Sequence, residues 1–252
     1  MSVNRKIFYE RKSEMKIVHL CLGAFFPDNY SYQENMLPKF HKKQGYDVEV
    51  IASLETFDND GKTCYYSEAK RYTNENDVLV TRLNYKSPDK FYKKLKRFSG
   101  LSQALEMAKP DILFIHNVQF LDMDKVVSYL KRNKKVKVFC DNHADFTNSA
   151  KGFVSRRILH GIIWKHCAKS IEPYTTKFYG VLPARVDFLK EVYGLPEEKC
   201  ELLVMGADDD RVSQASDPAV REAVRKRYKI NDDEILLVTG GKIDHNKTQT
   251  LT

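Results

Sequence analysis

The stretch "KIVHLCLG" at positions 16–23 decides the fold class. Its largely apolar run predicts a strand that is buried on both faces, as in a parallel sheet covered by helices. Similar runs follow, and helical patterns separate them, at 46–53, 77–85, 111–117, 135–142, 177–183 and 200–206. Such alternation predicts an α/β fold, a doubly wound, Rossmann-like parallel sheet with helices on both faces.

The composition limits the class of protein. Of 252 residues, 42% are hydrophobic, which is enough for a core, and the net charge of +8 favours anionic partners. The five cysteines include no C-x-x-C pair, which indicates reduced thiols in a cytoplasmic protein. The sequence has no apolar run of about 18 residues and no apolar signal core near its start, so neither a spanning helix nor a secretory signal is expected.

The chain divides by composition. Residues 1–14 are a charged extension, 15–206 form the main domain, and the polar stretch 207–231 predicts a linker. Residues 232–252 predict the start of a second domain, whose first strand is "EILLVTGG" (234–241). One strand cannot pair its own backbone or cover its own faces, so it either docks on the edge of the first sheet or belongs to a domain that is incomplete in this chain, and we expect the second.

Three residues follow strands at the edge of the sheet where ligands bind. Gly23 either lets the backbone approach a phosphate or sugar or simply forms a turn, because no G-x-G-x-x-G motif is present. His116 and His143 can exchange a proton or bind a hydroxyl near neutral pH. Asp141 and Asp145 flank His143 and are expected to orient it or raise its pKa. No metal site is expected, because H-x-H and H-E-x-x-H spacings are absent.

Two stretches mix aromatic and basic residues, at 89–98 and 152–169. This pattern suits contact with an anionic membrane surface, and it equally suits ordinary amphipathic helices with a solvated basic face. No nucleic-acid-binding module is recognisable, so nucleic acid is not an expected partner.

The stretch "TGGKIDHNK" (239–247) combines glycines with two lysines. Gly241 frees the backbone, and Lys242 and Lys247 can neutralise a diphosphate. The adjacent glycines precede the lysine, so the stretch is not a G-x-x-x-x-G-K-[ST] loop, and a solvated surface turn is the alternative.

In their order, these features resemble the amino-terminal half of a GT-B glycosyltransferase of the family 4 (group 1) type. The segments that carry the resemblance are "MKIVHLCLGAFFP", "LPKFHKKQGYDVEVIAS", "KPDILFIHN", "VLPARVDFLKEVYGLPEEKCELLVMGADDD" and "GGKIDHNK". The chain departs from the family at Tyr46, where histidine is usual, and at Val204 and Met205, where the family has Pro-Asn.

The resemblance implies transfer of a sugar from a nucleotide-sugar donor to a glycan or lipid-linked acceptor in cell-surface polysaccharide synthesis, at the cytoplasmic side of the membrane. It implies a retaining, metal-independent reaction that needs no cofactor, since the nucleotide sugar is a substrate. The catalytic residues that it implies are His143, Lys242 and Lys247. The donor-binding residues would be Gly23, Gly241, Lys242 and Lys247, and the acceptor-side candidates Tyr32, Gln33 and His116.

Two other functions fit the same residues. The first alternative is a non-catalytic binding or scaffold domain that keeps the fold. The second is part of another GT-B enzyme such as a sugar epimerase. The family's E-x(7)-E motif would lie after Thr252, so we expect this polypeptide alone to have little transferase activity.

Overall fold

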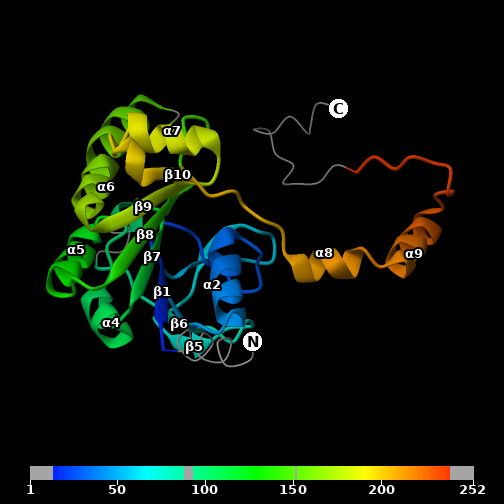
Figure 1. Cartoon of the computed structure of the whole chain (residues 1–252), viewed down its shortest axis with the longest axis horizontal. Coiled ribbons are helices and arrows are strands. Elements are labelled where there is room, and N and C mark those ends of the chain that lie inside the picture. Colours follow the sequence, from blue (N-terminus) through cyan, green and yellow to red (C-terminus); the bar gives the residue numbers. More distant parts are fainter. Residues whose placement is uncertain (1–13, 88–92, 151, 239–252) are drawn as a thin grey trace, which may run out of the picture. The chain divides into compact units, whose positions relative to one another are not determined.

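The computed structural model describes residues 14–87, 93–150 and 152–238. The chain forms two compact units, Met1–Met205 and Gly206–Thr252, which are described separately. The first unit contains the sheet and its helices, coloured from blue to yellow in Figure 1.

In the described part of the chain, eight strands form one sheet in the order β10-β9-β8-β7-β1-β2-β6-β5. Their bounds are β1 Lys16–Cys21, β2 Asp47–Ala52, β5 Arg71–Thr73, β6 Leu79–Arg82, β7 Ile112–His116, β8 Lys137–Asn142, β9 Thr175–Gly180 and β10 Cys200–Leu202. Every neighbouring pair is parallel except β5 and β6. The predicted doubly wound α/β class is therefore confirmed.

The edge strand β5 corrects one detail of that prediction. It runs antiparallel to β6, whereas the sequence predicted only parallel strands. The three residues of β5 lie in a polar stretch that predicts a loop, and an edge strand needs few apolar residues because only one side of it is paired. A small antiparallel hairpin, β3 (Glu55–Phe57) and β4 (Thr63–Tyr65), lies earlier in the same stretch.

The helices of the first unit follow the predicted order. They are α2 Gln33–Lys43, α4 Leu101–Ala108, α5 Met123–Arg132, η1 Val154–Trp164, α6 Lys165–Ile171 and α7 Pro183–Glu191, with short 3-10 turns η2 Glu172–Tyr174 and η3 Glu197–Lys199. Gly100 has φ +80° directly before α4, a backbone conformation that glycine adopts readily. Among the described residues, no helix has the length and apolar character that crossing a membrane requires.

Successive residues of β1 face opposite sides of the sheet. Val18 and Leu20 join a large apolar cluster that includes residues of α4, α5, α6 and α7. On the other side lies α2, which packs on β1 and β2. His19 belongs to this α2 side and is fully buried there. The two faces of the same strand thus differ in chemistry, aliphatic on one side and imidazole-bearing on the other.

The described part of the second unit contains two helices and no strand. The stretch predicted as a linker contains α8 (Asp209–Ala215) and α9 (Pro218–Tyr228), and the Asp217 side chain caps α9 by accepting the Ala219 amide at 2.9 Å. No strand forms over 234–238, the described part of the strand expected there, and Leu237 is 89% exposed. Gly241, Lys242 and Lys247 lie outside the described residues, as does most of the 1–14 extension.

Candidate functional site

The topology directs attention to the carboxyl ends of β1 and β7. Strand β1 pairs with β2 on one side and with β7 on the other. The strand order therefore reverses at β1, since β2 and β6 lie on one side of it and β7 to β10 lie on the other. In open α/β sheets, ligands bind in the crevice at such a switch point.

A pocket of about 450 Å³ lies at this point. Its lining residues are Gly23, Ala24, Phe25, Tyr32, Gln33, Glu34, Phe57, Lys96, Asn117, Gln119, His143 and Met205. Four residues expected from the sequence, Gly23, Tyr32, Gln33 and His143, therefore line one cavity. His116 does not line it, because its side chain is fully buried behind the pocket wall.

Gly23 is explained by packing. A Cβ at this position would lie 2.3 Å from the carbonyl oxygen of Asn117, which is too close for any side chain. The Gly23 carbonyl accepts a hydrogen bond from Lys96 Nζ at 2.9 Å, so the loop is tied down at the pocket. A close approach of two strand ends thus accounts for the glycine, and contact with a phosphate or sugar stays a prediction.

His143 lies between two carboxylates. Its Nε2 is 3.5 Å from Asp141 Oδ1 and 3.7 Å from Glu34 Oε1. Burial alone would lower the pKa of His143, but the nearby carboxylates outweigh burial, and Arg185 opposes them only weakly, so the pKa is raised. The imidazolium form is therefore favoured at the pocket.

Asp141 is the buried anion behind His143. Its Oδ2 accepts from His116 Nδ1 at 2.7 Å, and its Oδ1 accepts the Asn117 amide at 3.0 Å. Burial would raise the pKa of Asp141, yet the histidines on both sides overcome burial and hold that pKa well below its usual range. Burial has the opposite outcome at Glu34, whose pKa is raised despite the two histidines, so this group accepts a proton more readily.

Several polar atoms at the pocket have no hydrogen-bond partner among the residues that the structure describes. They are Gln33 Oε1, Asn117 Oδ1 and His143 Nε2. Buried polar atoms are nearly always paired, so three orphan atoms around one cavity indicate a place for polar groups of a ligand. Two amide oxygens and one imidazole nitrogen are suitable partners for hydroxyl groups.

Asp145 does not take the role expected from its position beside His143. Its Oδ1 accepts from Thr147 and from the Asn148 amide, and its Oδ2 pairs with Arg185 Nε at 3.2 Å. Asp145 therefore holds the loop after β8 in shape, and Asp141 and Glu34 are the carboxylates near His143.

Two histidines that the sequence reasoning missed lie on the α2 side of the sheet. His19 Nδ1 is 3.0 Å from His116 Nε2, and His19 Nε2 is 3.0 Å from His41 Nδ1. The signal in the sequence was a histidine inside the apolar run 16–23, since a buried strand tolerates an imidazole only when it is hydrogen-bonded.

Two further histidines lie outside this site. His160 is buried, with Nε2 at 2.9 Å from Ser149 Oγ and Nδ1 at 3.0 Å from Tyr193 OH. His166 is exposed. Over the described ranges, no cluster of three or more histidine, cysteine or acidic side chains has the arrangement of a metal site.

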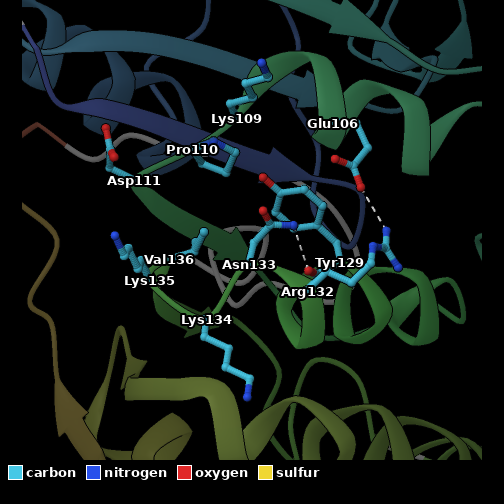
Figure 2. A pocket seen from close by; sticks show the side chains of 10 residues that line it. All are labelled: Glu106, Lys109, Pro110, Asp111, Tyr129, Arg132, Asn133, Lys134, Lys135 and Val136. Atoms are coloured by element: carbon cyan, nitrogen blue, oxygen red, sulfur yellow. Dashed lines mark hydrogen bonds and ion pairs between the residues drawn. The ribbon is translucent and has the colours of Figure 1, made fainter.

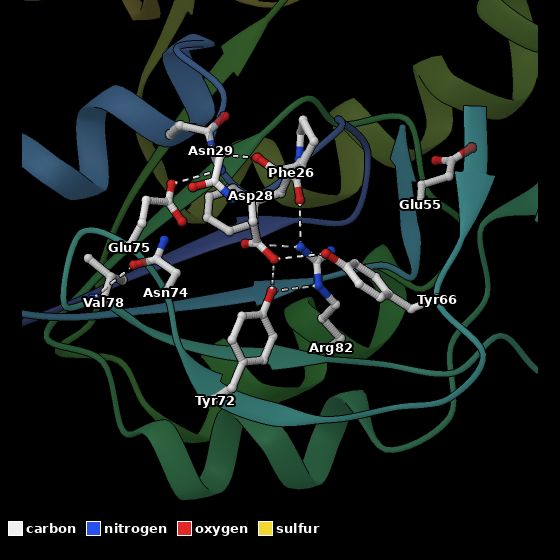
Figure 3. A network of polar contacts seen from close by, with 12 residues as sticks. Phe26, Asp28, Asn29, Glu55, Tyr66, Tyr72, Asn74, Glu75, Val78 and Arg82 are labelled. Carbon is white, nitrogen blue, oxygen red and sulfur yellow. Dashed lines mark hydrogen bonds and ion pairs between the residues drawn. The ribbon is translucent and has the colours of Figure 1, made fainter. Parts of the chain in front are cut away.

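A second buried network supports the loop after β1. Figure 3 shows the guanidinium of Arg82 among its partners. It donates to Tyr72 OH at 2.9 Å and to the Phe26 carbonyl at 2.7 Å, and it pairs with Asp28 at 3.4 Å. Because Phe26 and Asp28 belong to the segment that follows Gly23, this network fixes one wall of the pocket.

A larger depression of about 520 Å³ lies at the opposite edge of the sheet. Figure 2 shows its charged lining, which includes an ion pair between Arg132 and Glu106 at 2.8 Å. Residues 109–111 and 133–136 of its lining directly precede β7 and β8, so it lies at the amino ends of these strands. Ligand sites of this architecture lie at the carboxyl ends, so we assign the candidate site to the smaller pocket.

Solved structures share this fold. Sucrose-phosphate synthase (tll1590) from Thermosynechococcus elongatus matches 81% of this chain and 53% of its own, with 12% identity and a TM-score of 0.51. A glycosyltransferase from Rickettsia africae matches 87% of this chain and 50% of its own, with 16% identity and a TM-score of 0.47. HepE of Anabaena, solved with UDP and glucose, matches 85% of this chain and 50% of its own, with 10% identity and a TM-score of 0.47.

The comparison with sucrose-phosphate synthase shows the fold and nothing finer, because the identity is low. The chain spans about half the length of the solved structures that it matches. No family model matches the sequence, and no curated protein matches it.

Proposed function

We propose that this chain is the acceptor-binding part of a glycosyltransferase, which moves a sugar from a nucleotide-sugar donor to a glycan or lipid-linked acceptor. The pocket at the ends of β1 and β7 carries the proposal. Its volume of about 450 Å³ lies within the range of small-molecule sites, and its orphan amide and imidazole atoms suit the hydroxyl groups of a sugar. The shared fold with sucrose-phosphate synthase is consistent with this function.

The proposed chemistry is displacement at the anomeric carbon of the donor sugar. The bond from that carbon to the diphosphate oxygen breaks, the acceptor oxygen forms the new bond on the same face of the sugar, and the proton of the acceptor hydroxyl passes to the departing diphosphate. Negative charge develops on the departing diphosphate, and fixed positive charges that face it lower the barrier. We assign this role to Lys242 and Lys247, with Gly23 and Gly241 leaving room for the phosphates.

His143 would contact the sugar itself. Its raised pKa favours an imidazolium that donates a hydrogen bond to a sugar oxygen, while Tyr32 and Gln33 contact the acceptor. His116 is fully buried, so its contribution would pass through Asp141. The reaction proposed here uses no metal and retains the anomeric configuration.

The test uses the product of the complete reading frame that contains this chain. Thermal unfolding is followed with UDP-, GDP- and ADP-sugars, and a true donor at about one hundred times its Kd adds roughly 2.7 kcal/mol of stability. Lys242→Met and Lys247→Met should abolish that stabilisation, while the matched control Lys134→Met, an exposed lysine at the other edge of the sheet, should keep it. If no nucleotide sugar raises the melting temperature, the proposal fails.

Product analysis then separates transferase from epimerase. A transferase releases a nucleoside diphosphate and extends a glycan or lipid-linked acceptor. An epimerase instead leaves an altered sugar on the same nucleotide. Binding of a nucleotide sugar without either product would favour a non-catalytic scaffold.

We further propose that the enzyme works at an anionic membrane surface on the cytoplasmic side, in polysaccharide synthesis. The exposed side chains at the start of η1 support this, because Phe153 is 76% exposed and Arg156 and Arg157 stand beside it. Aromatic and basic residues together suit such an interface. Sedimentation with vesicles should show binding when anionic lipid is present, and Phe153→Ser should weaken it. Equal binding to neutral vesicles would contradict the electrostatic part.

A further inference from the structure

A row of hydrogen-bonded imidazoles crosses the α2 side of the sheet. It begins at His41 on α2, continues through His19 on β1 and His116 on β7, and ends at Asp141 on β8. The distances between ring nitrogens are 3.0 Å at each of the first two steps, and the last step to the carboxylate is 2.7 Å. The row therefore links three neighbouring strands and a helix without a gap.

The two ends of the row have different surroundings. His19, His116 and Asp141 are buried, whereas His41 is partly exposed and lines a depression of about 320 Å³ beside Tyr46. At the other end, Asp141 Oδ1 faces His143 in the pocket. The row thus joins the surface beneath α2 to the wall of the candidate site.

The hydrogen bonds allow two proton patterns. A carboxylate only accepts, so His116 must donate to Asp141 from Nδ1. If every imidazole is neutral, each donates from Nδ1 and accepts at Nε2. If His116 carries an extra proton, its Nε2 donates to His19 Nδ1, and His19 then donates from Nε2 to His41. Both patterns satisfy every bond of the row.

One proton converts the first pattern into the second. It joins His41 at Nε2, the Nδ1 proton of His41 moves to His19 Nε2, and the Nδ1 proton of His19 moves to His116 Nε2. No ring rotates and no other group changes charge. One proton is taken from solvent, and an imidazolium appears beside the buried carboxylate.

We propose that His41, His19 and His116 form a proton relay that charges the buried His116–Asp141 pair from solvent on the α2 side and thereby tunes the charge of His143 in the pocket. The inference concerns the chain's own groups, so it holds whichever ligand the pocket takes.

The surroundings determine where the proton rests. Burial, together with the neighbouring imidazoles, lowers the pKa of His19 far below its usual range, and burial with His116 lowers the pKa of His41 to about 4. Neither ring keeps the proton, and only His116 has a carboxylate beside it. Glu34 of α2 acts on His116 through space.

The coupling to His143 follows from the shared carboxylate. The charges that act on His143 come from Asp141, from Glu34 on α2 and from Arg185 on α7. When His116 is charged, it compensates Asp141, and the attraction between Asp141 and the His143 imidazolium weakens. Loading the relay therefore makes His143 release its own proton more easily.

The test is ¹⁵N NMR of the whole chain labelled at histidine. While the three rings are neutral, His19, His41 and His116 should all carry their proton on Nδ1, although free imidazole prefers Nε2. Wherever His116 is doubly protonated, His19 and His41 should both be in the Nε2–H form, so the three signals should change together when the sample is acidified. An Nε2–H form of any of the three at high pH, or protonation of His116 without the two switches, would overturn the relay.

A variant separates a relay from a merely structural row. In His41→Gln the amide can still bond to His19 but cannot pass a proton, so proton exchange at His116 should slow at least about tenfold, because it then waits for local opening. The midpoint of the His143 titration reports the coupling between His116 and His143. The matched control is His166→Gln, which changes an exposed ring. An unchanged rate of proton exchange at His116 in His41→Gln would refute the proton route. If this variant folds poorly, the tautomers of the wild-type protein still test the relay.

Discussion

Two buried polar networks on the same sheet differ in how completely they are paired. Around Arg82, the guanidinium donates to a tyrosine hydroxyl and two carbonyls and pairs with Asp28, which also accepts from Tyr66 and Tyr72. Around Asp141, the row of imidazoles is paired internally, but His143 Nε2 at its pocket end has no hydrogen-bond partner among the described residues. A fully satisfied network holds a fold, whereas one that ends in orphan atoms at a cavity leaves bonds for something else.

The largest expected effect comes from the paired network. Arg82→Leu should lower the free energy of unfolding by about 3 to 5 kcal/mol, because the carbonyl of Phe26 and the Asp28 carboxylate lose their partner while still largely buried. Urea denaturation measures this change.

The matched control is Arg132→Leu, which breaks an exposed ion pair with Glu106. It should lower stability by less than about 1 kcal/mol. Equal losses for the two arginines would mean that the network around Arg82 has no special structural role.

The next effect concerns Gly23, whose backbone lines the same pocket as His143. Gly23→Ala should cost about 2 to 3 kcal/mol, because the new Cβ would meet the Asn117 carbonyl at 2.3 Å and the strand ends must separate. Thermal or urea unfolding measures the loss. Gly152→Ala meets nothing within 4 Å and should change stability by less than about 0.5 kcal/mol. A neutral Gly23→Ala would show that the glycine serves only a ligand.

A smaller effect appears only in acid. The pKa of His41 is lowered to about 4 by burial and by His116, so between about pH 6.5 and about pH 4 the unfolded chain binds a proton here that the folded chain does not. Stability therefore falls as the pH falls through this window, and His41→Gln should remove roughly 1 kcal/mol of that fall. Denaturation at several pH values tests this against His166→Gln, whose curve should follow the wild type.

The regular part of the fold could be predicted because its signals are local. The run 16–23 and its later equivalents predicted the parallel strands, and the helical patterns between them predicted the covering helices. The antiparallel strand over 71–73 and the helices within 207–231 were not predicted. The former is paired through its backbone, and the latter expose nearly all their side chains, so neither carries an apolar pattern.

Only those site residues that directly follow strands could be predicted from the sequence. Strand ends placed Gly23 and His143 at one edge, and the structure brings them to one pocket. Nothing in the sequence indicated that Glu34 would face His143, or that His19 and His41 would align with His116. These contacts join residues from a helix and separate strands, and only the three-dimensional packing of α2 on the sheet creates them.

The smallest effect on stability is expected at His143, which faces Asp141 from the pocket. His143→Gln should leave stability near the wild-type value at a pH above the folded pKa of His143, where the imidazole is neutral. Because the carboxylates raise the folded pKa of His143 against the opposing effect of burial, its stabilising contribution is present in acid and is lost as the pH rises through that pKa. The wild type should thus gain over His143→Gln as the pH falls, while His166→Gln shows no such trend in paired denaturation curves. If the gain grew with rising pH instead, Asp141 and Glu34 would not hold the charge on His143, and this imidazole could not be the cationic group of the pocket.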